Sequence, residues 1–322
     1  MAVYTEVTDE DLALFLKRYD LGELLSFKGI AEGVENTNYL LHTTAGNFIL
    51  TLYEKRVATT DLPFFLGLME HLNSNGVSCP LPVRDLKGNH TGELCGRTAA
   101  IITFLEGICV KHPTPSHCLE LGRALARLHL AANGFALKRE NALGPKGWRP
   151  LFNHFAAQSE SIATGLKEDI TAELDWLEKD WPRGLPQGVI HADLFPDNVF
   201  FIGGKLSGVI DFYFACNDCL AYDLAICLNA WCFEDDCSFN ITKGRALMSG
   251  YNDVRPLSEA ECAAMPILAR GAALRFLLTR CYDWLNTPED AIVKPHDPKA
   301  YLRRLRFHQR TATTAEYGFN PA

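Results

Sequence analysis

The first third of the chain is patterned differently from the remainder. Short apolar runs separated by glycine-bearing turns predict an antiparallel sheet over the first hundred residues. Beyond them, apolar residues recur mainly at three- and four-residue spacing, which predicts helices. We expect strands over 27–34, 38–42, 48–53 and 99–107, a further hairpin around 87–89, a loop over 134–150, and helices over 8–16, 61–72, 115–131, 151–165, 168–180, 221–233, 242–251, 258–285 and 298–315. This order of elements predicts an α+β protein.

One set of predicted strands interrupts the helical part. A short apolar strand leads to Asp193, and the loop after it carries Asn198. A second apolar run over 199–202, a two-glycine turn at 203–204 and a third run then lead to Asp211. Two β-rich runs joined by such a turn predict a hairpin. The hairpin brings Asn198 and Asp211 to one edge of a sheet, with Asp193 one short loop away.

These three side chains suit phosphoryl transfer. The reaction uses Mg²⁺, which prefers carboxylate and other hard oxygen ligands together with substrate phosphates. It also uses a carboxylate that orients the attacking hydroxyl and accepts its proton. We therefore predict Asn198 and Asp211 as metal ligands and Asp193 as the catalytic base. The alternative is a buried hairpin whose turn carboxylates are merely solvated.

Composition narrows the class of protein. The 322 residues are 48% hydrophobic and 22% charged, which is an ordinary globular balance, and the length suggests about two domains. A net charge of -8 argues against nucleic acid as the main partner. The N-terminal sequence has no signal-peptide pattern, and no apolar run is long enough to predict a membrane span.

Eleven scattered cysteines, an odd number, are most simply reduced thiols in a cytoplasm. Cys216 and Cys219 form a C-x-x-C pair, but no second close pair or histidine cluster accompanies them as a zinc site would require. We expect the cysteines of this region to be small buried hydrophobes.

The order H-x-D-x4-N followed by I-D-F, from His191 to Phe212, resembles the catalytic motifs of the aminoglycoside phosphotransferase and choline kinase group. Relative to protein kinases, Ala192 replaces an arginine and Tyr213 a glycine. The resemblance implies a bilobal, protein-kinase-like fold with ATP in the cleft between the lobes. A small antiparallel-sheet lobe over 1–104 would bind the nucleotide, and a mainly helical lobe over 105–322 would carry catalysis and substrate binding.

The resemblance also implies roles for residues outside the central motif. Thr51 stands where the group has a basic residue on its third strand, and Phe64 or Phe65 stands where the helix has the paired glutamate. Lys55 or another basic group would then reach the phosphates instead. The ATP-binding candidates are Gly33, Val34, Thr51, Ile101, Thr103, Phe104 and Leu105, and the supports of the catalytic loop are His191 and Asp223. For Asp223 a helix N-cap is the alternative.

A closer resemblance, to the bacterial homoserine kinases of this superfamily, extends over nearly the whole chain. It rests on the segments 33–39, 48–54, 62–72, 191–198 and 275–284. It implies ATP-dependent phosphorylation of the L-homoserine hydroxyl, a step toward threonine. The substrate-binding candidates are Asn36, Tyr39, Arg275 and Tyr282, with Arg280 as the alternative to Arg275 for the substrate carboxylate and Asp218, Glu234 or Asp235 for its ammonium group.

Other substrates stay open on the residues alone. Tyr213, Phe214, Trp231 and Trp284 are candidates for an aromatic cage around choline. Asp218 and the acidic residues over 234–236 are candidates for a pocket that binds an aminoglycoside, and a methylthioribose-like sugar is a further alternative. A nucleotide-binding regulatory module without catalysis is the alternative from another class. The sequence makes no prediction of oligomeric state.

Overall fold

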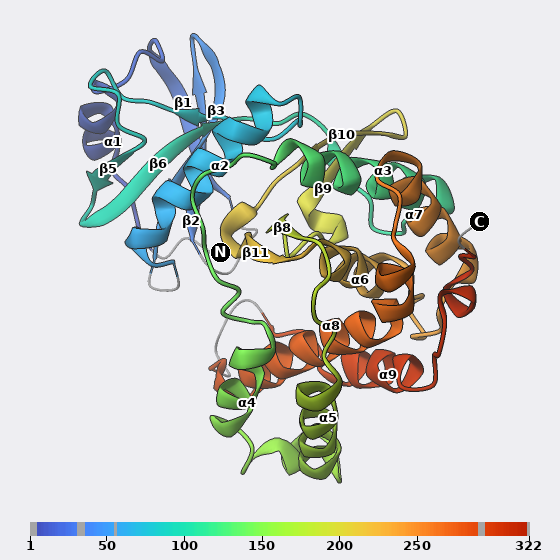
Figure 1. The fold of residues 1–322 in the computed structure, drawn as a ribbon. Helices are drawn as coiled ribbons and strands as arrows, with labels where there is room; N and C mark the ends of the chain where they lie inside the picture. The colour runs from blue at the N-terminus through green and yellow to red at the C-terminus, as the bar shows by residue number, and fades with distance from the viewer. Residues whose placement is uncertain (1–4, 31–35, 55–56, 289–293, 321–322) are drawn as a thin grey trace. The chain divides into compact units, whose positions relative to one another are not determined.

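The computed structural model describes residues 5–30, 36–54, 57–288 and 294–320 (Figure 1). The chain forms two compact units. The first comprises Met1–Glu106 together with Gly208–Tyr213, and the second comprises Gly107–Ser207 together with Phe214–Ala322. Because the chain returns briefly to the first unit, Asp211 belongs to that unit, whereas Asp193 and Asn198 belong to the second.

The first unit is built on a six-stranded antiparallel sheet in the order β1-β2-β3-β6-β4, with β5 paired to β6. Leu41, Leu50 and Ile101 contribute to a buried cluster with Leu12 and Phe15, so the first helix packs its apolar side against the sheet. The elements are α1 (Asp9–Leu16), β1 (Leu24–Ile30), β2 (Thr37–Thr43), β3 (Gly46–Leu52), η1 (Thr59–Asp61), α2 (Leu62–Ser74), β4 (Pro82–Val83), β5 (Thr91–Leu94) and β6 (Arg97–Thr103).

The hairpin predicted around 87–89 is wrong, because the strands on either side of it pair with β6 instead of with each other. Pro82 has no N–H to donate to such a hairpin. The residues between the strands form a tight turn in which the Asp85 carboxylate accepts the N–H groups of Lys87 and Asn89, at 2.9 and 2.8 Å. The true hairpin joins β5 to β6 through Cys95 and Gly96, both of which have positive φ.

The second unit is mainly helical, and the predicted α+β class is confirmed. Two small antiparallel sheets, β10-β9-β7 and β11-β8, lie among its helices. Its elements are β7 (Ile108–Cys109), α3 (Pro115–Ala131), α4 (Pro145–Asn153), η2 (Ser159–Ser161), α5 (Leu166–Asp180), β8 (Gln187–Ile190), η3 (Pro196–Asn198), β9 (Val199–Ile202), β10 (Lys205–Val209), β11 (Cys216–Cys219), α6 (Leu220–Trp231), α7 (Ile241–Val254), α8 (Glu259–Asn286), α9 (Lys299–His308) and η5 (Thr314–Tyr317).

Two predicted helices in this unit have wrong boundaries. The chain becomes helical at Pro145, inside the predicted loop, because a proline fits the first helical position after Gly144. That helix ends at Asn153, well before the predicted end at 165. The last predicted helix ends at His308, and Thr313 caps a separate 3-10 turn beyond it.

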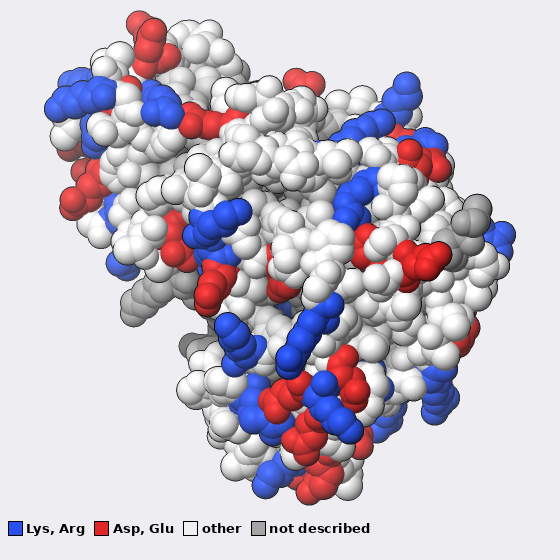
Figure 2. All heavy atoms as spheres, viewed as in Figure 1, with Lys and Arg blue, Asp and Glu red and all other residues white. Residues whose placement is uncertain are grey.

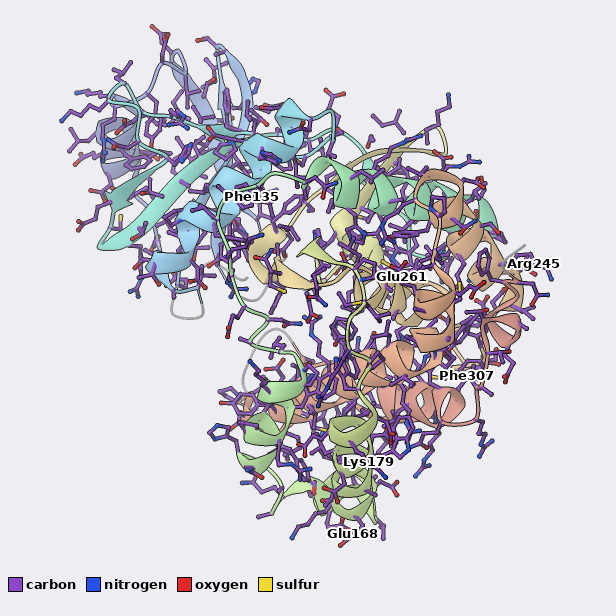
Figure 3. The ribbon with its side chains drawn as sticks, viewed as in Figure 1. Phe135, Glu168, Lys179, Arg245, Glu261 and Phe307 are labelled. Atoms are coloured by element: carbon purple, nitrogen blue, oxygen red, sulfur yellow. The ribbon has the colours of Figure 1, made fainter. Side chains whose placement is uncertain are left out.

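Close helix packing organises the second unit. A Cβ at Gly122 of α3 would lie 2.1 Å from the carbonyl oxygen of Leu247, and one at Gly250 of α7 would lie 2.2 Å from that of Leu119. Glycine at both positions therefore lets these two helices approach backbone to backbone. Helix α8 begins in a capping box between Ser258 and Glu261. Figure 3 labels Glu261. Helix α8 is long and apolar enough to cross a membrane, but 78% of its most apolar window is buried inside the protein, as in a core helix.

The face seen in Figure 2 carries basic and acidic side chains interspersed with each other, without a region of one sign alone. This face therefore offers no patch of one sign that would attract an oppositely charged polymer.

A buried histidine in the second unit predicts a pH-dependent stability. Burial, and then the charge of Arg304, lower the pKa of His308 to about 3, while its ring nitrogens contact the Tyr317 hydroxyl at 2.8 Å and the Asn229 side-chain oxygen at 3.2 Å. The folded protein keeps this ring neutral, whereas the unfolded chain protonates it below about pH 6.5. The contribution is thus fully present above that pH and is lost as the pH falls toward 3.

We expect the free energy of unfolding to fall by about 2 kcal/mol between pH 7 and pH 5 on account of this group. Urea unfolding at both pH values measures this change, and the unchanged protein is compared with His308→Gln. The exposed His112, changed to glutamine, is the control. Equal pH slopes in all three proteins would contradict the assignment.

Candidate active site

The loop that carries the central motif starts from a paired strand. Strand β8 pairs with β11, and Ile190 lies opposite Cys216. Directly after β8 the backbone of Ala192 adopts φ +65°, a conformation that costs a residue with a Cβ roughly 1 kcal/mol or more. Such a turn persists only where its surroundings hold it.

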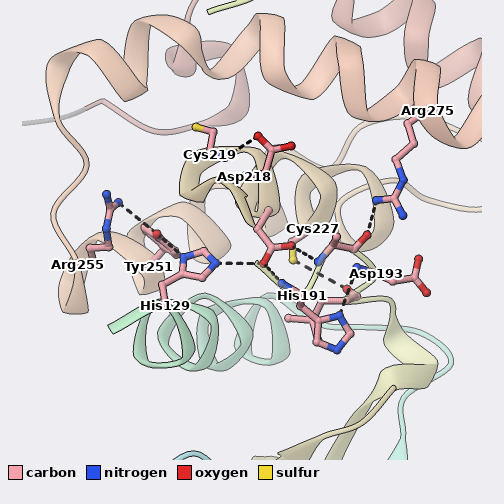
Figure 4. Close-up of polar contacts among 12 residues, drawn as sticks. His129, His191, Asp193, Asp218, Cys219, Cys227, Tyr251, Arg255 and Arg275 are labelled. Atoms are coloured by element: carbon pink, nitrogen blue, oxygen red, sulfur yellow. Dashed lines mark hydrogen bonds and ion pairs between the residues drawn. The ribbon is translucent and has the colours of Figure 1, made fainter. Parts of the chain in front are cut away.

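Asp223, in the first turn of α6, supplies that support. Figure 4 labels two of its partners, His191 and His129. The fully buried Asp223 carboxylate accepts the N–H of His191 at 2.7 Å and the N–H of Ala192 at 2.9 Å. Burial by itself raises the pKa of Asp223. The hydrogen bond and charge of His129, with those of His191, outweigh burial and hold the pKa below its ordinary value. The carboxylate is therefore ionised and clamps the turn from two sides.

The clamp continues into the helical core. His129 of α3 contacts Asp223 through Nε2 at 3.1 Å and the Tyr251 hydroxyl through Nδ1 at 2.8 Å, so both of its ring nitrogens have partners in the core. Arg255 donates to the same hydroxyl at 3.2 Å and to Glu261 at 2.9 Å. Tyr251, Arg255 and Glu261 were not among the residues singled out from the sequence. With His129 and Asp223 they form one buried network of hydrogen bonds.

The other end of the loop holds Asp193 and Asn198. The Asn198 amide nitrogen donates to the backbone oxygen of Asp193 at 2.8 Å and contacts its carboxylate at 3.4 Å. The amide oxygen of Asn198 makes no hydrogen bond within the described part of the chain. An amide oxygen is one of the hard oxygen ligands that Mg²⁺ accepts, so Asn198 fits the predicted metal role.

Arg275 lies behind the loop. Its guanidinium is 2% exposed, donates to the Ala192 carbonyl and lies over the rings of Phe276 and Phe214. Its position therefore favours support of the loop over contact with a substrate. Tyr282 lies about two turns after Arg275 on α8. It is 37% exposed, and its ring packs against the ring of His154.

Asp211 is exposed, follows β10 and has φ +64°, a left-handed conformation that aspartate tolerates better than most residues. The short helix η4 (Phe212–Phe214) begins directly after it. Within the first unit, the Tyr213 hydroxyl lies 3.2 Å from that of Tyr53. Burial raises the pKa of Tyr213 to about 12, its hydrogen bond with Tyr53 opposes the rise, and the Asp211 carboxylate adds to it.

Most backbone donors near the predicted adenine site are already used. Ile101 is fully buried in β6. The N–H of Thr103 donates to the Leu81 carbonyl, the Thr103 hydroxyl accepts the Leu81 N–H, and the Phe104 N–H donates to the Asn47 carbonyl. Among the described residues, Leu105 is the first after β6 whose N–H has no partner. The candidates Gly33, Val34 and Lys55 lie outside the described residues.

Two substrate candidates lie in the first unit. Asn36 is 4% exposed and its side-chain oxygen accepts the Glu54 N–H at 3.3 Å. Tyr39 is buried in the cluster beneath the sheet, where its hydroxyl accepts the Val7 N–H and donates to the Thr5 carbonyl. The Tyr39 hydroxyl is thus already bonded on both sides, and we assign it no substrate contact.

The cysteines form no centre of their own. Across the described ranges, no three His, Cys, Asp or Glu side chains gather as they would around a metal ion. Burial raises the pKa of Cys216 to about 12 and that of Cys219 to about 11, so both thiols are protonated and unreactive at neutral pH. Among the aromatic residues that could surround a choline, Trp231 is buried and donates to the Leu194 carbonyl, whereas Trp284 is 46% exposed.

Comparisons with known proteins give the family by sequence. The model of the phosphotransferase enzyme family matches residues 26–257. The chain is 63% identical over 322 residues to the homoserine kinase of Chelativorans sp. (strain BNC1), with 100% of both chains covered. It is 62% identical over 318 residues to the homoserine kinase of Sinorhizobium fredii, with 99% and 98% covered.

Solved structures share the fold at low identity. An amicoumacin kinase in complex with AMP-PNP and Ca²⁺ superposes with a TM-score of 0.70 at 17% identity, and 95% of each chain is covered. A choline kinase from Cryptosporidium parvum Iowa II gives a TM-score of 0.70 at 15% identity over 97% and 98% of the chains. With full-length relatives above 60% identity, the chain belongs to the phosphotransferase enzyme family and, within it, to the homoserine kinases.

Proposed function

We propose that the protein transfers the γ-phosphoryl group of ATP to the side-chain hydroxyl of L-homoserine and that it does so in the cytoplasm. The observation that carries the proposal is the geometry of the loop. The buried Asp223 carboxylate clamps the turn at Ala192, and that turn presents Asp193 beside Asn198. The free state of all eleven cysteines fits a reducing compartment.

Asp193 is the proposed base. Its carboxylate orients the homoserine hydroxyl and takes its proton while the hydroxyl oxygen bonds to the γ-phosphorus, and the bond from that phosphorus to the bridging oxygen of ADP breaks. The Asn198 amide oxygen and the Asp211 carboxylate are the proposed ligands of Mg²⁺. When bound, that ion offsets the negative charge that builds on the phosphate oxygens. Strands β9 and β10 pair, with Asn198 directly before the one and Asp211 shortly after the other.

For the adenine ring we propose the N–H of Leu105 as the donor, since the N–H groups of Thr103 and Phe104 are used inside the sheet. Ile101 then contributes to the sheet beneath rather than to hydrogen bonding.

Arg280 of α8 is our candidate for the substrate carboxylate. It is half-buried, and its guanidinium lies 4.4 Å from the centre of the Tyr301 ring. Within the described residues it makes no ion pair and no hydrogen bond. Burial and the charge of Arg304 lower the pKa of Arg280, while Tyr301 and the carboxylates of Asp297 and Asp193 act in the opposite direction. A partly desolvated cation without an anion is costly to the fold, and a substrate carboxylate would offset that cost.

We expect Arg280→Gln to raise the KM for homoserine about 100-fold, the loss of one partly buried charged pair, with the KM for ATP unchanged. Arg280→Lys should recover part of the loss, because it restores charge without the planar fork. Initial-rate kinetics at saturating ATP measure both. The control is Arg303→Gln on the exposed side of α9. A KM for homoserine equal in Arg280→Gln and Arg303→Gln would remove Arg280 from the site.

The function itself is tested by ADP release and product identification with homoserine, choline, kanamycin, methylthioribose and no acceptor. Turnover with homoserine alone is the expected result. Turnover with another acceptor would keep the mechanism and overturn the substrate. ATP binding without turnover on any acceptor would favour a regulatory module.

A further inference from the structure

The first unit has no ion pair at the positions where kinase-like folds join their third strand to the following helix. Thr51 stands on β3 and Phe65 on α2 in place of the charged partners. Both are buried, at 2% and 1% exposure. Their neighbours show what the fold uses instead.

Two hydrogen bonds between uncharged groups lie in this part of the first unit. Thr51 donates its hydroxyl proton to the Asn38 side-chain oxygen at 2.8 Å, opposite it on β2. The Tyr213 hydroxyl lies 3.2 Å from the Tyr53 hydroxyl, which is within hydrogen-bond distance. Neutral polar groups therefore stand in place of the charged pair.

The Tyr213 ring is held as firmly as its hydroxyl. It packs edge-on against Tyr53, with centroids 5.5 Å apart at 81°, and against Phe65 of α2, at 5.6 Å and 88°. Aromatic pairs prefer this edge-to-face arrangement. Tyr213 thus contacts α2 through its ring, and it contacts Tyr53, the residue that follows β3, through both ring and hydroxyl.

Tyr213 also lies two residues after Asp211, whose φ of +64° needs support from its surroundings. A side chain fixed at ring and hydroxyl restricts the backbone that leads to it. We propose that Tyr213 is a positioning residue that holds the Asp211 carboxylate in place by tying it to α2 and to Tyr53 through neutral groups. The inference rests on the proposed function in one respect, that Asp211 is a metal ligand.

The test measures Mn²⁺ binding to the full chain in the presence of AMP-PNP, with electron paramagnetic resonance as the readout. We expect Tyr213→Phe, which removes the hydroxyl and keeps the ring, to weaken Mn²⁺ binding about 10-fold. Phe65→Leu should weaken it by a smaller factor. The matched control is Tyr19→Phe, because Tyr19 is also buried in the first unit but its hydroxyl has no partner there. The KM for homoserine should not change in any of these variants.

Asp211→Asn separates failure of the inference from failure of the proposed function. If Asp211→Asn abolishes Mn²⁺ binding while Tyr213→Phe binds like Tyr19→Phe, the metal assignment stands and the positioning role is wrong. If Asp211→Asn binds Mn²⁺ normally, the metal assignment itself is wrong and the inference falls with it. Weakened binding in Tyr213→Phe with unchanged thermal stability supports the role, whereas a loss that tracks the loss of stability would show that the tyrosine is merely structural.

Discussion

Asp193→Asn should lower kcat about 1,000-fold and leave the KM for ATP nearly unchanged. General-base catalysis contributes about 100- to 10,000-fold, and an amide has the shape of the carboxylate but cannot take the proton. The fold should tolerate the change, because Asp193 is half-buried and its backbone oxygen, rather than its carboxylate, accepts the shorter hydrogen bond from Asn198. Single-turnover kinetics with homoserine separate the chemical step from product release.

The matched control is Asp197→Asn, an exposed aspartate in the same loop. This variant removes the same negative charge from the loop as Asp193→Asn does, but it should keep full turnover. If Asp193→Asn retains more than about a tenth of kcat, proton transfer to this carboxylate contributes little, and the role of base must pass to another group.

Asp223→Asn should have the second large effect, on stability and on turnover together. The amide can accept only one of the two N–H groups that Asp223 holds, and it turns its own N–H toward the other. Removing one charged partner from a buried network costs about 3–5 kcal/mol. The turn at Ala192 then relaxes, and a displacement of the base by about 1 Å costs about 100-fold in kcat.

Urea unfolding and kcat measure the two effects, with Asp180→Asn at the exposed end of α5 as the control for charge. Should Asp223→Asn fail to fold, His129→Gln weakens the same carboxylate from one side only and should give smaller losses of both quantities. A stable Asp223→Asn protein with full kcat would show that the loop does not depend on the clamp.

Local sequence was sufficient for the central loop and for the class of fold. Strand β9 was predicted at its observed bounds, because an apolar run between a loop and a two-glycine turn has few other solutions. The pairing of β4 with β6 was not predictable in this way, since both neighbours of a strand in a sheet can come from distant sequence. The boundaries of α4 were missed because Pro150 lies inside a short helix, where proline usually marks an end.

Contacts between residues far apart in the chain were predicted only where a motif marked the residues. His129 and Tyr251 are separated by 122 residues, and His191 and Asp223 by 32. Only the second pair carried a signal, through the motif at the start of α6. Arg275 was identified as an arginine close to the site, but periodicity cannot say whether a guanidinium faces a substrate or a backbone carbonyl. What stands in place of the charged pair on β3 and α2 became visible only with the contacts of Tyr213.

The clamp on the loop turns two amide protons into reporters of its motion. The N–H protons of His191 and Ala192 both point at the buried Asp223 carboxylate, so neither can exchange with deuterium until that carboxylate separates from the loop. Their exchange rates therefore measure how often the base leaves its working position, in the resting protein and without any substrate. Similar rates at the two sites would mean that the whole turn opens in one step, and a slower rate than at exposed loop amides would give the free energy that this opening requires.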